Sequence, residues 1–367
     1  MSYAPGEDAE ALRGVVRDFL DKRSSESEVR RLMESPEGYD PDVWHRGAAE
    51  LGLNGLTLPE TYGGSDAGMV ELGVVFEEMG RSLLCSPFFP TVAMAAWALM
   101  ESSDPAARDR YLPGIASGET IATLGWGGTD PLASAVTATE GPTGWRLDGR
   151  ADYVVFGSTA TLVLVIAETT NGPSLFAVSA DEGVTRTSLI ALDSTRGLSH
   201  LDFDNAPAKS VDSTADTLQR ALDRSSLLLA AEQLGGAQHT LEMAVEYAKN
   251  RVQFGRRIGS FQAIKHRCAD LLVEVESARS VVWHGLWNVD QDDANLPVAA
   301  ALAKAVCSEV YVHVAAENIQ IHGGIGFTWE HPAHLYLKRA KSSQLLFGSD
   351  AAQRSRLATL LGVPEGV

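Results

Sequence analysis

Apolar residues recur every three to four positions through the first third of the chain. Near the N-terminus, Leu12, Val16 and Phe19 fall on one face of a helix, which is the spacing that a helix with one buried side requires. Stretches rich in glycine and proline interrupt the pattern. The predicted helices cover residues 7–34, 41–51, 69–81 and 88–102. Together they predict an all-helical N-terminal domain, residues 1–118.

The pattern changes at about Glu119. Six or seven short stretches then alternate polar and apolar residues or are rich in β-branched residues, and Gly, Asn, Asp or Pro separates most of them. They predict a small β-sandwich or barrel over residues 119–210. Long apolar faces return at 218–250, 261–289, 296–321 and 331–361, and they predict a C-terminal four-helix bundle within 211–367. The fold class is therefore α+β.

Composition narrows the class of protein. The chain has 367 residues and a formal charge of −18, which makes non-specific nucleic-acid binding a poor expectation. We expect no membrane span, because no apolar run reaches the roughly 18 residues that one needs, and the N-terminus lacks a signal-peptide core. Cys85, Cys268 and Cys307 are widely spaced, as expected for buried thiols in the reducing cytoplasm rather than for a disulfide or metal site.

Two stretches carry candidate chemistry. Residues 247–266 concentrate basic side chains in an acidic chain and include Gly255 and Gly259. Such a cluster suits an anionic ligand such as a phosphate, which Arg251 can grip with two hydrogen bonds. The alternative is a helix–turn–helix corner with a solvated basic face. The second stretch, residues 319–330, contains adjacent glycines that admit close backbone contact.

These stretches have the forms RxQFGxxIxxFQxxKH and QxHGGxGFTxE, and in this order they resemble the acyl-CoA dehydrogenase family of flavoproteins. The N-terminal segment WxxxAxELGLxGLxLPExYGG resembles the same family. The resemblance implies FAD as cofactor and an acyl-CoA thioester as substrate. It also implies a tetramer, a dimer of dimers packed through the C-terminal helices, and an electron-transfer flavoprotein as electron acceptor.

The resemblance also assigns cofactor-binding residues. Its first motif implies contacts with the FAD of a neighbouring subunit, and its second implies contacts with the other end of that dinucleotide. The matching residues are Arg251, Gln253, Phe254, Gln262, Gln320, Gly323 and Gly324. A core aromatic is the alternative for Phe254. His322 is expected to be a core histidine, and His331 and His334 lack neighbours at metal-ligand spacing, so we predict no metal site.

The chain departs from the family where the chemistry occurs. The family removes an α-proton from the thioester with a glutamate, while the β-hydrogen passes as hydride to the flavin. The usual position of this base corresponds to Phe347, which cannot accept a proton, and a second family position corresponds to Ser225. A serine without a histidine partner is no general base. Asp223 matches an acid near the substrate, and Ser226 stands where an arginine is usual.

The β-domain departs as well. The segment that reaches the flavin ring in the family is represented by LGWGGTD, in which Thr129 and Asp130 are the remnant. Tyr153 can still cover the flavin face, but Val155 replaces a threonine that usually forms a hydrogen bond near N5.

Three interpretations stay open at this stage. The first is a base-lacking subunit of a hetero-oligomeric acyl-CoA dehydrogenase, like those of actinobacteria. The second is a self-sufficient enzyme with a displaced base such as Glu232, which lies two helical turns beyond Ser225. The structural alternative for Glu232 is a buried carboxylate that bridges to an arginine. The third is a non-redox binding or scaffold protein. The acyl chain of the substrate and the choice between homo- and hetero-oligomer stay undecided.

Overall fold

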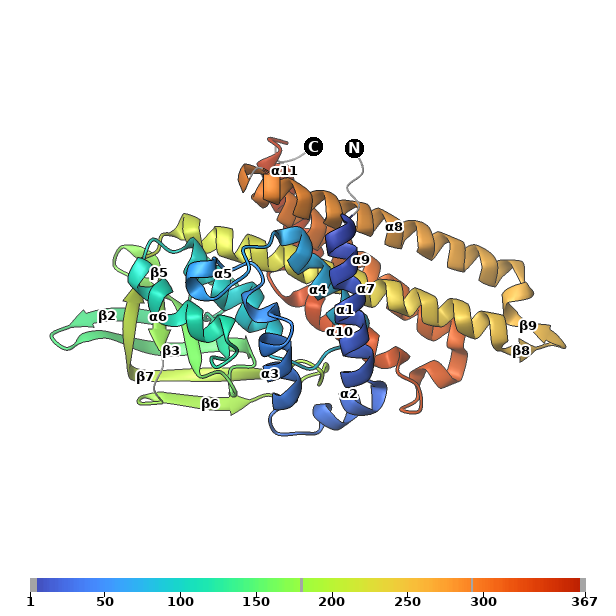
Figure 1. Cartoon of the computed structure of the whole chain (residues 1–367), viewed down its shortest axis with the longest axis horizontal. Helices are drawn as coiled ribbons and strands as arrows, with labels where there is room; N and C mark the ends of the chain where they lie inside the picture. The colour runs from blue at the N-terminus through green and yellow to red at the C-terminus, as the bar shows by residue number, and fades with distance from the viewer. Residues whose placement is uncertain (1–4, 179–180, 292, 364–367) are drawn as a thin grey trace. The chain divides into compact units, whose positions relative to one another are not determined.

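The computed structural model describes residues 5–178, 181–291 and 293–363. Helices come first, then strands, then helices again (Figure 1), which confirms the predicted fold class. The chain forms two compact units. One comprises the described residues of Met1–Arg30, Met69–Leu84 and Ser226–Val367, and the other those of Arg31–Gly68 and Cys85–Ser225. The helices α2 (Glu26–Met33) and α7 (Ala215–Asn250) have residues in both units.

The first unit is helical. Besides parts of α2 and α7, it contains α1 (Glu7–Arg23), α4 (Met69–Arg81), α8 (Gln262–Gln291), α9 (Leu296–His322), α10 (Ala333–Leu345) and α11 (Asp350–Leu360). Helix α9 packs against α8, α10 and α11. Two glycines bring α4 and α7 into backbone contact, because a Cβ on Gly80 would lie 1.9 Å from the Glu232 carbonyl oxygen and one on Gly235 would lie 1.8 Å from that of Glu77. This crossing fixes Glu232 and its neighbours at the centre of the bundle.

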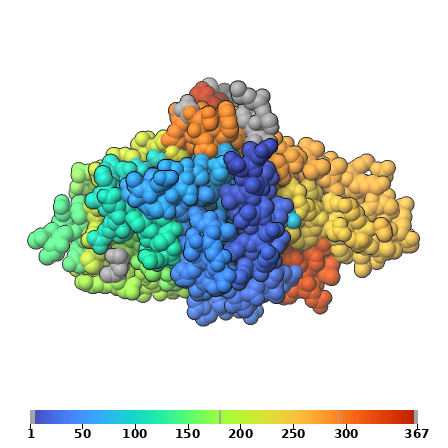
Figure 2. Space-filling model, in the orientation of Figure 1, coloured from blue at the N-terminus to red at the C-terminus, as the bar shows by residue number. Residues whose placement is uncertain are grey.

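The helix predicted over 7–34 is two helices. Ser24 has φ −124° and ψ 47° and ends α1, while its hydroxyl donates to the Ser82 carbonyl at 3.1 Å. Ser25 Oγ then accepts from Glu28 N at 3.4 Å, as an N-cap does. Local serine hydrogen bonds therefore override the periodicity. Helix α1 contributes to the molecular surface (dark blue in Figure 2).

The predicted C-terminal helix over 331–361 is also divided. Helix α10 ends at Leu345, a turn follows, and α11 begins at Asp350. Phe347 and Gly348 in the turn have φ values of +58° and +89°, which a right-handed helix cannot contain. The side chain of Ser349 caps α11 by accepting from Ala352 N at 3.2 Å.

The second unit combines short helices with a barrel-like sheet. Its helices include α3 (Pro41–Ala49), α5 (Ala96–Glu101) and α6 (Pro105–Ala116). The helix predicted over 88–102 starts as a π-helix, η3 (Phe89–Ala95), before α5 continues it. A π-helix leaves backbone carbonyls offset from the α pattern, and such segments are frequent at functional sites.

The sheet confirms the predicted strands of the middle region. Its strands are β1 (Ala122–Gly125), β2 (Thr137–Gly141), β3 (Gly144–Val155), β4 (Leu162–Thr169), β5 (Gly172–Val178), β6 (Val184–Ser188) and β7 (Leu198–Val211). The pairings β4–β5–β7–β3–β2–β4 run in a closed circuit, and β1 and β6 extend it. Residues Leu162–Ala167 of β4 are all buried, so both faces of this strand are covered.

The expectation that no segment is apolar enough to span a membrane was wrong by length and composition. Among the described residues, Asp293–Phe327 has an 18-residue window with a mean hydropathy of 1.4. However, 61% of that window is buried inside its unit. Burial by neighbouring helices accounts for the apolar composition of α9, as in the core helix of a bundle.

Candidate functional site

The first predicted motif forms a β-hairpin at the end of the first unit. Strands β8 (Val252–Gln253) and β9 (Arg256–Arg257) pair between the end of α7 and the start of α8 (Figure 1). Phe254 and Gly255 make the two-residue turn with φ values of +53° and +75°. Positive φ at both central residues is the pattern of a type I′ turn, which matches the twist of the strands. The predicted break at Gly255 is therefore a well-defined two-residue β-turn.

The hairpin presents an aromatic ring and cationic groups to solvent. Phe254 is 90% exposed, and Arg251, Gln253 and Arg256 are exposed. The Arg256 guanidinium lies 4.0 Å from the centre of the Phe261 ring, which fixes the base of the hairpin. The interpretation of Phe254 as a core aromatic does not hold within this chain. A bulky aromatic residue with positive φ is uncommon, and its exposed ring is available for contact with another molecule.

The second predicted motif lies at the end of α9. Gly323 has φ +65° and ψ −144°, a backbone conformation that is essentially confined to glycine. A Cβ added to Gly323 or Gly324 would meet no atom within 4 Å among the described residues, so the backbone of this turn is open to a ligand. Gln320 is exposed one helical turn earlier.

An aromatic stack brings the two motifs together. Tyr247 and His322 have ring centres 4.2 Å apart. Tyr247 accepts from Arg251 N at 2.8 Å through its carbonyl, and His322 directly precedes Gly323. His322 is 4% exposed and donates from Nδ1 to the Asn318 carbonyl at 2.8 Å, and burial lowers its pKa. His322 thus links the motifs as a core histidine, which agrees with its expected role.

This end of the unit fits a phosphate-containing cofactor. Exposed arginines can neutralise phosphate groups, open glycine backbone allows close approach, and an exposed aromatic ring can cover a flat ring system. Gln262 lies exposed at the first position of α8 and adds an amide to the same corner. The residue types are those that a dinucleotide such as FAD requires.

Phe347 and Ser225, the residues at the two positions where the resemblance predicts a base, both take part in hydrogen bonds within the chain. Phe347 lies in the turn between α10 and α11, where its carbonyl accepts from Gln353 Nε2 at 2.5 Å. Ser225 is fully buried, and its hydroxyl lies 2.7 Å from the Ala93 carbonyl and 2.8 Å from that of Ala221. The hydroxyl therefore satisfies a carbonyl of the π-helix η3. Ser225 is in a structural role that sequence alone did not reveal.

The substitute carboxylate, Glu232, forms a buried ion pair. Its Oε1 lies 2.8 Å from Arg339 Nη1, and the two side chains are only 6% and 4% exposed. Arg339 Nη2 also donates to the Leu84 carbonyl at 3.4 Å. This geometry favours the structural alternative for Glu232, because its carboxylate already has the buried Arg339 guanidinium as a partner.

Asp223 and the remnant residues of the flavin segment lie in the second unit. Asp223 is 1% exposed and accepts from Gln219 Nε2 at 2.9 Å. Asp130 accepts from Leu132 N at 2.9 Å and caps a short 3₁₀ helix, while Val155 is buried. Tyr153 has φ +52° and is 62% exposed, so its ring is available to cover a ligand.

Sequence reasoning missed a group of polar core residues around Lys304. Lys304 is fully buried on α9, where it donates to Ser308 Oγ at 2.8 Å. Ser308 also accepts from Gln233 Nε2 at 3.1 Å. A lysine inside the apolar run LAKAVCSEV was the available signal, since a charge on the buried face of a helix requires partners.

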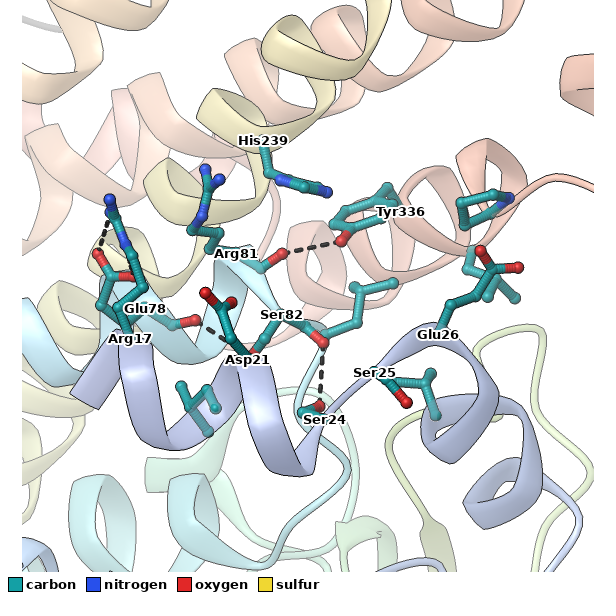
Figure 3. A pocket seen from close by; sticks show the side chains of 15 residues that line it. Arg17, Asp21, Ser24, Ser25, Glu26, Glu78, Arg81, Ser82, His239 and Tyr336 are labelled. Carbon is teal, nitrogen blue, oxygen red and sulfur yellow. Dashed lines mark hydrogen bonds and ion pairs between the residues drawn. The ribbon is translucent and has the colours of Figure 1, made fainter. Parts of the chain in front are cut away.

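A cavity in the first unit, of about 240 Å³, lies among α1, the end of α4, α7 and α10 (Figure 3). Arg17 donates to both carboxylate oxygens of Glu78 at 2.8 and 2.7 Å, and Tyr336 donates to the Arg81 carbonyl at 2.8 Å. Burial, assisted by the Arg81 charge, lowers the pKa of His239 to about 4. These groups are largely paired with one another, so we assign no ligand to the cavity. In the part of the chain that the structure describes, no group of His, Cys, Asp and Glu side chains could hold a metal ion.

Comparison with known proteins gives consistent matches over both ends of the chain. The family profile described as "Acyl-CoA dehydrogenase, N-terminal domain" matches residues 6–119, and "Acyl-CoA dehydrogenase, C-terminal domain" matches residues 215–361. The Mycobacterium tuberculosis protein named acyl-CoA dehydrogenase IpdE2 is 36% identical over 354 residues, which cover 96% of this chain and 97% of that protein.

Solved structures are similar to this chain over nearly its whole length. A chain of the ChsE4-ChsE5 complex from Mycobacterium tuberculosis superposes with a TM-score of 0.91 and 29% identity, covering 100% of both chains. A chain of a variant of the Tcur3481-Tcur3483 steroid ACAD superposes with a TM-score of 0.90 and 32% identity, covering 97% of this chain and 98% of that chain.

Proposed function

The chain belongs to the acyl-CoA dehydrogenase family, and on that premise we propose that it is the base-lacking subunit of a hetero-oligomeric enzyme. As a family member it is an oxidoreductase with FAD as cofactor. The reaction is the α,β-dehydrogenation of an acyl-CoA thioester. We propose domain limits at residues 1–118, 119–210 and 211–367.

One feature carries the proposal: the family resemblance aligns Phe347 with the proton acceptor, and Phe347 lies in a turn where its carbonyl accepts from Gln353 Nε2. Removal of an α-proton needs a group that can accept it within hydrogen-bonding reach of the C–H bond. A phenyl ring cannot do so. Ser225 at the second position is hydrogen-bonded to backbone carbonyls, and Glu232 is paired with Arg339. A partner subunit with a glutamate would supply the missing step.

The exposed hairpin supports a role for this chain in its partner's cofactor site. FAD accepts the hydride when it is bound. We propose that Arg251, Gln253, Phe254 and Gln262 contact the FAD of the neighbouring subunit. Gln320, Gly323 and Gly324 would contact the other end of the same dinucleotide. Phe254 is 90% exposed here, so docking against a neighbouring subunit would bury it.

Two solved structures support a proposal for the form of the assembly and the class of substrate. The ChsE4-ChsE5 structure is described as a complex, and the Tcur3481-Tcur3483 protein as a steroid ACAD. We propose a heterotetramer with an acyl-CoA dehydrogenase-like partner and a bulky polycyclic acyl group as substrate. We further propose that the enzyme works in the cytoplasm and passes electrons to an electron-transfer flavoprotein.

The test is the visible spectrum of bound flavin during anaerobic addition of acyl-CoA esters, including a steroid side-chain thioester. The chain is measured alone and co-purified with acyl-CoA dehydrogenase subunits encoded beside it. We expect bleaching only in the complex. Bleaching of the chain alone would show that it carries a working base, and a colourless complex after FAD reconstitution would favour a scaffold protein.

A matched pair of variants sharpens this test. In a complex whose partner has its glutamate replaced by glutamine, turnover should be lost. Phe347→Glu in this chain should then restore measurable turnover, whereas Phe347→Gln should not. Equal activity of the two variants would exclude the turn as the position of the base.

A further inference from the structure

Lys304 is a charged group in the centre of the bundle. It lies on α9, its side chain is 0% exposed, and burial lowers its pKa to about 8 against a smaller opposing effect of Asp350. At neutral pH it is therefore mainly protonated. A buried ammonium is tolerated only where hydrogen-bond acceptors replace its water.

Three acceptors meet the three donors of the ammonium. Lys304 Nζ lies 2.8 Å from Ser308 Oγ, 3.1 Å from the Gln344 carbonyl and 3.4 Å from the Gly348 carbonyl. Gln344 is in the last turn of α10, where backbone carbonyls have no partner within the helix. Gly348 stands just before the start of α11. The two carbonyls therefore bracket the turn that contains Phe347.

This turn needs an external restraint. Phe347 and Gly348 are consecutive residues with left-handed φ values, and the first is a bulky aromatic residue. Such a conformation persists only where the surroundings over-determine it. Gln353 Nε2 holds the Phe347 carbonyl from the α11 side, and Lys304 holds the turn from the α9 side.

We propose that Lys304 is a positioning residue: its ammonium ties both ends of the α10–α11 turn to α9 and so fixes residue 347 where the family places its base. The assignment of residue 347 to the base position rests on the proposed function. The restraint itself is independent of it. Ser308 extends the link to Gln233 on α7, so the turn is tied to a second helix through a hydroxyl.

The physical consequence is local. Replacing Lys304 with methionine keeps most of the side-chain volume and removes all three hydrogen bonds. The carbonyls of Gln344 and Gly348 then lose the same donor, and the strained turn should open more often. Amides of residues 346–349 should exchange faster, because exchange reports local opening. The hairpin at 251–257 shares no contact with Lys304 and serves as an internal reference.

The experiment is hydrogen–deuterium exchange by mass spectrometry on the FAD-loaded complex, comparing the natural chain with Lys304→Met. We expect about a tenfold or greater rise in exchange confined to peptides over 344–350. Unchanged exchange in these peptides would overturn the proposal. If Lys304→Met unfolds, Ser308→Ala replaces it. This variant keeps the ammonium but removes one acceptor, and the same peptides should respond while those over 251–257 do not.

A kinetic readout separates positioning from support of the fold. In the Phe347→Glu complex with the inactivated partner, Lys304→Met should lower kcat about tenfold or more with little change in KM or FAD content, since only the reacting carboxylate is displaced. An equal loss of kcat and of bound FAD would overturn the positioning role. The exchange result does not depend on activity, so failure of the proposed function and failure of the restraint are distinguishable.

Discussion

The buried pair of Glu232 and Arg339 gives the most discriminating prediction, because a base and a structural ion pair respond oppositely to one substitution. Glu232→Gln removes the carboxylate and places a neutral amide beside the Arg339 guanidinium, which is 4% exposed. Breaking a buried pair on one side costs about 3–5 kcal/mol. An unfolding entropy of about 2.1 cal/mol/K per residue amounts to about 0.8 kcal/mol/K for a chain of this length, so about 4 kcal/mol lowers Tm by about 5 °C.

The assay combines Tm by calorimetry with turnover per folded complex. Glu232→Gln and Arg339→Met should each lower Tm by about 5 °C, and the double variant should regain at least half of the loss, since no charge is left unpaired. Turnover should follow the amount of folded enzyme. As a control, Glu309→Gln breaks the exposed pair with Arg354 and should change stability by no more than about 1 kcal/mol.

The opposite result would refute this reasoning. If Glu232→Gln abolished turnover with Tm unchanged, while Arg339→Met kept its activity, Glu232 would be acting as the base. The chain would then be a self-sufficient enzyme.

Three further predictions address the cofactor site and the buried lysine. Gly324→Val should leave Tm within about 1 °C, because an added Cβ meets no atom within 4 Å. It should weaken FAD retention about tenfold or more, measured by flavin released on dilution. Full retention of FAD would place the cofactor elsewhere. Arg251→Ala should weaken FAD retention of the complex about tenfold, whereas Arg267→Ala, which loses the pair with Glu317, should not. Lys304 should make urea stability rise between about pH 8 and 10.5 by up to about 3 kcal/mol, because its pKa is lower in the fold than its ordinary 10.5 and the unfolded chain binds more protons there. Asp350 and the Cys307 thiol face the same site, and burial raises the pKa of this thiol to about 12. The rise in stability should be absent in Lys304→Met. An equal dependence of stability on pH in the natural chain and in Lys304→Met would contradict this prediction.

The periodic apolar pattern was sufficient to predict the order of helices and strands, because long buried faces dominate the energetics of α7, α8 and α9. It failed where a few polar contacts decide the backbone. Ser24 and Ser25 divide the first helix, and the left-handed pair at Phe347 and Gly348 divides the last. Neither break involves a proline, so periodicity alone continued each helix across it.

The candidate site was predictable in residue type and less so in geometry. The glycine and arginine pattern pointed to a phosphate corner, and the structure joins its two parts through the stack of Tyr247 on His322. That contact pairs residues 75 positions apart, and sequence spacing cannot reveal it. The partner of Glu232 is equally remote, since Arg339 lies on a different helix. Burial could be inferred for Glu232, but the choice between a base and an ion pair needed the position of the arginine.

The turn at residues 346–349 is held through backbone carbonyls, by contacts that do not depend on the side chain at position 347. Without such contacts we would expect this turn to relax, because a left-handed phenylalanine costs about 1–3 kcal/mol. Instead the buried ammonium of Lys304 and the amide of Gln353 hold the turn from both sides. These contacts therefore stabilise a backbone shape whatever side chain it presents. Because glutamate is smaller than phenylalanine, Phe347→Glu also removes side-chain bulk at this turn. A return of activity with Phe347→Glu should thus be accompanied by a changed preference among acyl groups of different bulk.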